Sequence, residues 1–193
     1  NELTEEIIST LVARGAPINS WGVGTHMVTG GNESSFTGVY KLAARHDKES
    51  DKMLPAMKFS DNPAKTTNPG IKNVYRLYDS NGMALADILA LEGETIEAGK
   101  EYRFHHPMVD YRQFTCKAAK VEPLLKKRIE DGKRITKRLP DNEQLKISRT
   151  TMQSQLETFD ESYKRILNPH IYKVSLTEKL MELKKDFIEK NLK

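Results

Sequence analysis

The segment SWGVGTHMVTGG, residues 20–31, restricts the possible folds of this chain more than any other stretch. A helical pattern precedes it, in which Thr4 can cap the first turn and Gly15 stands where a left-handed C-terminal cap would fall. Residues 16–21, APINSW, then read as a short buried strand. The order helix, strand, glycine-rich loop is typical of an α/β barrel or a doubly wound sheet, whose ligands bind at the carboxyl ends of strands.

Two interpretations of the glycine-rich loop stay open from these residues alone. Small residues after a strand let backbone N–H groups converge on an anion, and the hydroxyl of Thr25 adds a donor beside Gly22 and Gly24. The other interpretation is a tight turn that binds nothing. The loop lacks the lysine of a Walker motif and the third glycine of a dinucleotide-binding motif, which excludes those two classes of nucleotide site.

Residues 36–104 are predicted to be rich in β structure. The patterns of 36–44 and 54–60 predict strands. Residues 73–91 predict a hairpin, because Asn81-Gly82 lies between two apolar runs and is a strong signal for a tight turn.

A lysine-rich loop, SDNPAKTTNPGIK at 60–72, separates these predicted strands from the hairpin. Lys58, Lys65 and Lys72 lie in or beside it, together with three hydroxyl side chains. Three ammonium groups and three hydroxyls suit a diphosphate. A solvated surface loop explains the same composition, and it is the usual structure of lysine-rich turns.

Residues 105–193 are predicted to be mainly helical. One helix is expected over 147–167, ended by Asn168-Pro169, and another after a capping box formed by Ser175 and Glu178. The expected buried faces of the two helices are Met152, Leu156, Phe159, Tyr163 and Ile166 in the first, and Leu176, Leu180, Leu183 and Phe187 in the second.

The composition excludes several classes of protein. A single cysteine, Cys116, rules out an internal disulfide and a cysteine-based zinc site. No apolar run is long enough to span a membrane, and a cytoplasmic location is therefore expected. The five histidines form no metal-binding or nucleophile motif. The basic segment 126–138 alternates with acidic residues and lacks aromatic ones, so a solvated face fits it better than an RNA site.

Five motifs together resemble one enzyme family, the bacterial nicotinate phosphoribosyltransferases, in the C-terminal half of those proteins. The resemblance covers nearly the whole chain, and the order and spacing of the motifs fit. The residue after Thr25, often basic in that family, is His26 here. The motifs are INSWGVGTHMVTG at 18–30, TGVYKLAAR at 37–45, MKFSDNPAKTTNPGIKNVYRLY at 57–78, HPMVDYRQF at 106–114 and NPHIYKVSLTEKL at 168–180.

The resemblance implies an enzyme that condenses nicotinate with phosphoribosyl pyrophosphate, giving nicotinate mononucleotide and pyrophosphate in NAD salvage. ATP hydrolysis is coupled to the transfer through a phosphorylated histidine, and Mg²⁺ is expected on the diphosphate. The implied fold mixes helices and strands (α+β or α/β). Residues 1–35 would be the last βα portion of an irregular type II phosphoribosyltransferase barrel with its phosphate loop, 36–104 a β-rich segment, and 105–193 a mainly helical C-terminal extension.

The resemblance also implies roles for single residues. The loop after the last barrel strand binds the ribose 5′-phosphate in this family, and the lysine-rich loop approaches the pyrophosphate or the nucleotide phosphates. The phosphorylated histidine and the nicotinate-binding residues belong to the N-terminal half, so no catalytic residue and no metal ligand is expected here. The implied phosphate-binding residues are Gly22, Gly24, Thr25, Lys65 and Lys72, and the possible substrate-binding residues are Asn1, Lys41 and Lys58.

The partners implied are nicotinate, phosphoribosyl pyrophosphate, ATP and the missing N-terminal half, in a homodimer whose active site is completed across the interface. Neither a membrane nor a nucleic acid is expected as a partner, and the chain alone is expected to be inactive. A basic nucleic-acid-binding module and a protein-interaction module are the alternatives. The related enzymes that act on nicotinamide or quinolinate are disfavoured by the motifs GVYKL and NPHIYKVSL.

Overall fold

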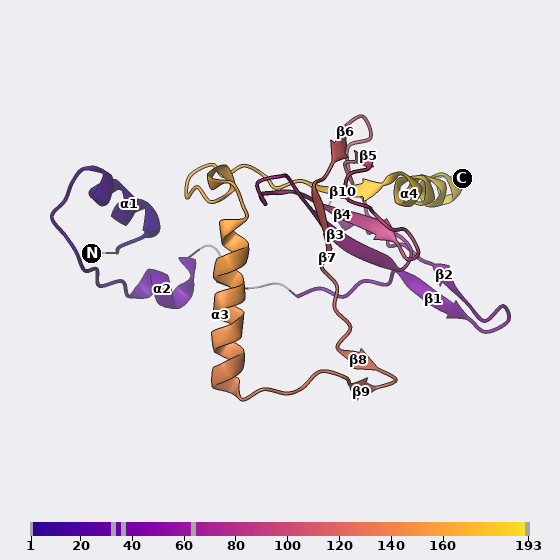
Figure 1. The fold of residues 1–193 in the computed structure, drawn as a ribbon, viewed down its shortest axis with the longest axis horizontal. Helices are drawn as coiled ribbons and strands as arrows, with labels where there is room; N and C mark the ends of the chain where they lie inside the picture. The colour runs from indigo at the N-terminus through magenta and orange to yellow at the C-terminus, as the bar shows by residue number, and fades with distance from the viewer. Residues whose placement is uncertain (1, 32–33, 36–37, 63–64, 192–193) are drawn as a thin grey trace. The chain divides into compact units, whose positions relative to one another are not determined.

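A computed structural model describes residues 2–31, 34–35, 38–62 and 65–191 (Figure 1). The chain divides into two compact units, and each is described by itself. The first comprises Asn1–Tyr40 and Glu161–His170, and the second comprises Lys41–Asp160 and Ile171–Lys193. Helices and strands are both present, which confirms the predicted mixed class. The boundaries predicted after residues 35 and 104 stay predictions.

Two helices from the N-terminal segment lie in the first unit, α1 (Glu5–Ala13) and α2 (Thr25–Thr29), with a 3-10 turn at Glu161–Tyr163. The predicted first helix is confirmed. The hydroxyl of Thr4 accepts the N–H of Ile7 at 3.3 Å, which is the bond that an N-cap makes.

The strand predicted over 16–21 is wrong, since the structure has no strand there. The N–H of Ile18 turns back to the carbonyl of Ala16 at 2.8 Å, and 17–20 are exposed. A strand exists only where a neighbour accepts its backbone hydrogen bonds, and no neighbour pairs with this segment among the described residues.

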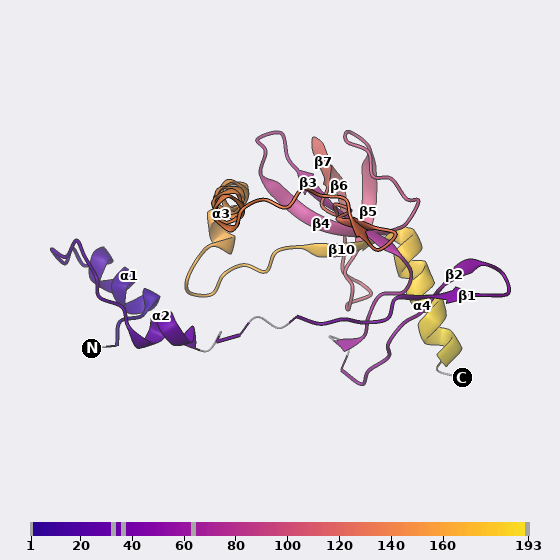
Figure 2. The same cartoon turned by 90° about the horizontal axis from the view of Figure 1, so that it is seen from below.

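A six-stranded sheet forms the centre of the second unit, and Figure 2 shows that it curls. The strand order is β6-β5-β10-β4-β3-β7, in which only the β10–β4 pair is parallel. Two-stranded ribbons, β1-β2 and β8-β9, complete the strands of this unit. The strands are β1 (Ala44–Asp47), β2 (Lys52–Pro55), β3 (Lys72–Tyr78), β4 (Ala84–Leu91), β5 (Glu101–His105), β6 (Gln113–Lys117), β7 (Lys120–Pro123), β8 (Ile129–Glu130), β9 (Lys133–Arg134) and β10 (Val174–Thr177).

The predicted hairpin is confirmed as β3 and β4. The carboxylate of Asp79 accepts the N–H groups of Asn81 and Met83 at 2.8 and 2.9 Å, and Gly82 has a φ of +79°, which favours glycine. This local chemistry fixes the turn and, with it, the register of the two strands.

The two other strands predicted in 36–104 are misplaced. Residues 36–37 lie outside the described residues, 38–43 form no strand, and pairing begins only at β1. The second strand, β2, ends at Pro55, whereas 56–60 run on as irregular chain. The β1–β2 turn occupies 48–51, where Ser50 donates to the carboxylate of Asp47.

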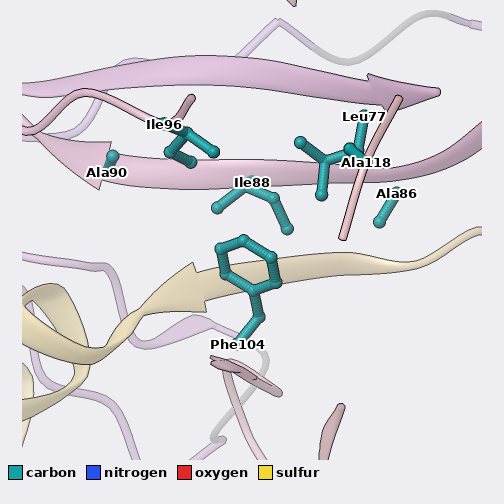
Figure 3. Packing of buried hydrophobic residues seen from close by; sticks show 7 residues of the cluster. All are labelled: Leu77, Ala86, Ile88, Ala90, Ile96, Phe104 and Ala118. Carbon is teal, nitrogen blue, oxygen red and sulfur yellow. The ribbon is translucent and has the colours of Figure 1, made fainter. Parts of the chain in front are cut away.

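The core lies on one face of β3 and β4, where alternate side chains of β4 point to the same side (Figure 3). Phe104 of β5 points toward Ile88, and both are almost completely buried. A second cluster joins Leu176, Leu180 and Met181, which seats the last helix, α4 (Glu178–Asn191), against the sheet.

The prediction of a mainly helical segment over 105–193 is wrong for its first part, which contains β6 to β9. Cross-strand pairing of aromatic side chains, such as Phe104 with Phe114, stabilises β5 and β6 there. Helices occupy α3 (Asp141–Glu157) and α4.

The first predicted helix of this segment ends ten residues earlier than expected. Thr158 caps α3, and its carbonyl accepts the N–H of Ala84 at 2.7 Å, which draws the chain onto the sheet. Phe159, Tyr163 and Ile166 are therefore not on the helix, and every residue of α3 is exposed.

The predicted capping box is also wrong. Ser175 is buried in β10 opposite Ile88, and the hydroxyl of Thr177 accepts the N–H of Leu180 at 3.4 Å instead. Leu176 and Leu180 are buried as predicted, whereas Leu183 and Phe187 are only half-buried.

None of the helices in the described part of the chain combines the length and the apolar character that crossing a membrane requires.

Candidate functional site

The glycine-rich loop leads into α2. Gly24 occupies the N-cap position with no side-chain cap, and its φ of −108° and ψ of −99° lie outside the α and β regions. An added Cβ at Gly22 or Gly24 would meet no atom within 4 Å. Neither a clash nor a left-handed backbone conformation therefore requires glycine at residue 24. The first N–H groups of a helix have no acceptor within it, so Thr25 begins a short run of outward donors.

A hydrogen bond connects α2 to α1. Nε2 of His26 lies 2.9 Å from a carboxylate oxygen of Glu5. The pKa of Glu5 is lowered by a hydrogen bond from its own backbone N–H and, in smaller part, by His26. His26 thus holds the short helix that carries Thr25, a role that the sequence did not suggest. Asn1 lies outside the described residues.

The lysine-rich loop of the second unit is held by its backbone. The N–H of Lys58 donates to the hydroxyl of Thr67 at 2.9 Å, and the N–H of Thr67 returns to the carbonyl of Lys58 at 3.1 Å. The N–H of Lys65 donates to the carbonyl of Asn62 at 2.9 Å. The side chains of Lys41, Lys58 and Lys65 are exposed, and no ion pair involves them among the residues described.

Lys72 differs from those three lysines. Its ammonium donates to the carbonyls of Asn68 at 2.8 Å, Pro69 at 3.4 Å and Gly70. Burial lowers the pKa of Lys72. This lysine closes the end of the loop onto β3, and a phosphate contact at Lys72 would compete with all three bonds.

A groove of about 1170 Å³ lies between the lysine-rich loop, the β5–β6 loop and α4. Ser60 and Thr66 line it from the first segment, Pro107 and Met108 from the second, and Lys184 from the helix. Two motifs that carried the family resemblance, 57–78 and 106–114, therefore meet at one surface. Sequence reasoning missed this groove, because its three walls are distant along the chain.

The β5–β6 loop is shaped by a histidine. Nδ1 of His106 accepts the N–H groups of Met108 and Val109, both at 3.1 Å. Burial lowers the pKa of His106, and the charges of Arg112 and Lys184 lower it further. The neutral ring is thus favoured, as its acceptor role requires.

Its neighbour His105 points elsewhere. Nε2 of His105, which is buried, lies 3.0 Å from the carboxylate of Glu178 at the start of α4. The interaction with the nearby ring of His105 lowers the pKa of Glu178. Within the part of the chain that the structure describes, no three His, Cys, Asp or Glu side chains are grouped to hold a metal ion.

Comparisons with known proteins agree on one family. The model named "Nicotinate phosphoribosyltransferase C-terminal domain" matches residues 71–184. Nicotinate phosphoribosyltransferase of Homo sapiens is 35% identical over 184 residues, which is 95% of this chain and 32% of that protein. The protein of the same name in Bacillus subtilis (strain 168) is 34% identical over 179 residues, 92% of this chain and 35% of that protein.

A solved structure is also similar. The crystal structure of human Nicotinic Acid Phosphoribosyltransferase matches with a TM-score of 0.56 and 30% identity, over 63% of this chain and 24% of that one. The chain spans about a third of the length of the curated relatives that it matches, and not the half that its sequence suggested.

Proposed function

Because this chain belongs to the nicotinate phosphoribosyltransferase family, whose C-terminal domain its residues 71–184 match, we propose that it is the C-terminal part of such an enzyme. The whole enzyme forms nicotinate mononucleotide and pyrophosphate from nicotinate and phosphoribosyl pyrophosphate, with ATP hydrolysis, in NAD salvage. The observation that carries this proposal is the similarity to enzymes of that name along 95% of the chain. Similarity along almost the whole chain supports a common function more strongly than a single common motif would.

In this proposal residues 1–35 join an irregular barrel, and the rest of that barrel comes from the N-terminal part. The phosphate loop comprises Gly22, Gly24 and Thr25. Its support is the N-cap position of Gly24, which offers no side-chain acceptor to the first N–H groups of α2, so that an anion could accept from them.

The lysine-rich loop contributes through Lys65, whose ammonium is exposed. Lys41 and Lys58 are exposed as well and are candidates for further substrate contacts. Lys72 orders the loop that carries Lys65, since its ammonium already binds three carbonyls. Asn1 stays a candidate from the family resemblance alone.

The chemistry that these groups supply is electrostatic. Negative charge grows on the pyrophosphate as its bond to C1 of the ribose breaks. Backbone N–H groups and an ammonium held in place neutralise that charge and position C1 against the nicotinate nitrogen. Mg²⁺ is proposed to arrive on the diphosphate, held largely by phosphate oxygens and water. ATP binding, a cytoplasmic location and a homodimer that shares its active sites are further parts of the proposal.

Gly24→Val in the full-length enzyme tests the phosphate loop. A Cβ does not clash with the protein there, so the variant keeps the packing of the loop. Its branched side chain would crowd a phosphate bound at the N-cap of α2. The KM for phosphoribosyl pyrophosphate should rise at least about ten-fold, while the KM for nicotinate changes little. Gly15→Val is the control, because Gly15 follows α1 with a φ of +73°, outside the phosphate loop. It should leave the ratio of the two KM values unchanged. Unchanged KM values for Gly24→Val would refute the assignment.

A further inference from the structure

We propose that the groove beside α4 binds an organic monoanion, a carboxylate joined to an apolar body, whose carboxylate pairs with Lys184. This site goes beyond the proposed function, because it uses none of the residues assigned there to the phosphates.

The first argument is the charge of Lys184. Only 6% of this residue is exposed, and its Nζ donates to the carbonyl of Pro107 at 2.6 Å. No carboxylate lies within ion-pair distance of it among the described residues. An ammonium has three donors, and a buried charge is costly unless an opposite charge meets it. Burial lowers the pKa of Lys184, with only the charge of Asp110 opposing that shift.

The second argument is the lining. Phe59 and Met108 are 40% and 51% exposed, so large apolar side chains of the groove stay in contact with water. The hydroxyl of Ser60 accepts the N–H of Asn62 and keeps its own proton to donate. An apolar surface with a few convergent donors is typical of a site for a small organic molecule.

The third argument limits the charge of the ligand. Two lysines, Lys184 and Lys185, face the groove together with three carboxylates, Asp61, Asp110 and Glu189. A polyanion such as pyrophosphate would be repelled by those carboxylates. A single carboxylate seated at Lys184 replaces the missing counter-charge without crowding them.

The experiment is an NMR titration of the ¹⁵N-labelled 193-residue chain with benzoate, benzamide and pyrophosphate as probes. Benzoate should shift amides of the three walls, and benzamide, its neutral analogue, should bind at least ten-fold more weakly. Lys184→Met should weaken benzoate binding at least ten-fold, Lys184→Arg should restore most of it, and Lys185→Met should change it less than two-fold.

Lys184→Met could also unfold the β5–β6 loop, since Lys184 holds Pro107. Ile188→Glu is the second variant, because it adds a carboxylate to the groove without touching that bond. It should weaken benzoate binding at least five-fold relative to Ile188→Gln. Gly24→Val should leave benzoate binding unchanged, which separates this site from the phosphate loop.

Three results would overturn the proposal. The first is equal binding of benzamide and benzoate at the groove, and the second is tighter binding of pyrophosphate than of benzoate there. The third is loss of the benzoate-induced shifts of groove amides in the full-length enzyme. The third result would mean that another part of the enzyme fills the groove.

Discussion

The guanidinium of Arg76 and the carboxylate of Asp87 form two hydrogen bonds of 2.8 Å across β3 and β4, where the two residues are direct partners. The guanidinium carbon lies 4.9 Å from the centre of the Phe159 ring, and the hydroxyl of Tyr172 donates to Asp87 at 3.1 Å. Bonding to Asp87 raises the pKa of Arg76. This ion pair thus contacts Phe159, which precedes residues 161–170, and Tyr172, which follows them. It holds both segments on β3 and β4.

Asp87→Ala should destabilise the chain strongly. The side chains of Arg76 and Asp87 are only 12% and 15% exposed, so the variant leaves a nearly buried guanidinium without its carboxylate. We expect a loss of about 3 kcal/mol in the free energy of unfolding, measured with urea. The double variant Arg76→Met with Asp87→Leu is the matched control, because it removes both charges and should lose less. A change of under about 0.5 kcal/mol for Asp87→Ala would contradict this role.

The two lysines of the lysine-rich loop should behave differently in the full-length enzyme. Lys65→Glu should raise the KM for phosphoribosyl pyrophosphate about ten- to a hundred-fold, with little change in the KM for nicotinate or in Tm. Lys72→Glu should lower Tm and affect both substrates, because three carbonyls lose their donor. If Lys65→Glu affects both substrates equally, the assigned phosphate contact is wrong.

The N-cap of α4 distinguishes the structure, in which Thr177 is the cap, from the sequence pattern, which predicted Ser175. Thr177→Val keeps the shape of the side chain but removes the hydroxyl that accepts from Leu180 and donates to Glu94 at 2.8 Å. Stability should fall by about 1 kcal/mol. Ser175→Ala, at the residue that the capping-box pattern selected, should cost less, and the opposite order in urea unfolding would favour that pattern.

The contact between His105 and Glu178 predicts that the free energy of unfolding depends slightly on pH. The pKa of Glu178 is lowered from 4.5 in the folded chain, so its contribution is present above that pH and is lost as the pH falls through the folded value. The side chain of Glu178 is 55% exposed, so Glu178→Gln should lose less than about 1 kcal/mol at pH 7. The loss should shrink as the pH falls below 4.5 and through the folded pKa. Glu182→Gln, also exposed on α4, should show no such difference.

Local signals predicted the parts of this fold that depend on near neighbours. The N-cap of Thr4 and the turn at Asn81-Gly82 are both confirmed, since each is fixed by contacts within about four residues. The strand expected at 16–21 failed for the opposite reason: its existence depends on a partner that is far away in sequence.

The order of the strands in the sheet depends instead on pairing between residues that are far apart in sequence. Val174 of β10 pairs with Asp87 of β4 in the middle of the sheet, although the two are far apart along the chain, and no periodicity reports such an insertion. The same limit hid the groove around Lys184. For the proposed phosphate loop, the pattern singled out Gly22, Gly24 and Thr25, and the structure adds that Gly24 stands at the N-cap of α2.

The central claim is that this chain supplies phosphate-holding loops and that the catalytic groups lie in the N-terminal part of the enzyme. Holding the reactants in one geometry can account for about 7–11 kcal/mol of such a barrier, and loops alone cannot provide it. The direct measurement is nicotinate-dependent release of pyrophosphate, followed in a coupled assay with the intact enzyme as reference. We predict no release above background for the 193-residue chain alone, and measurable release after a separately expressed N-terminal part is added. Clear nicotinate-dependent turnover by the purified chain alone would contradict this division between the two parts.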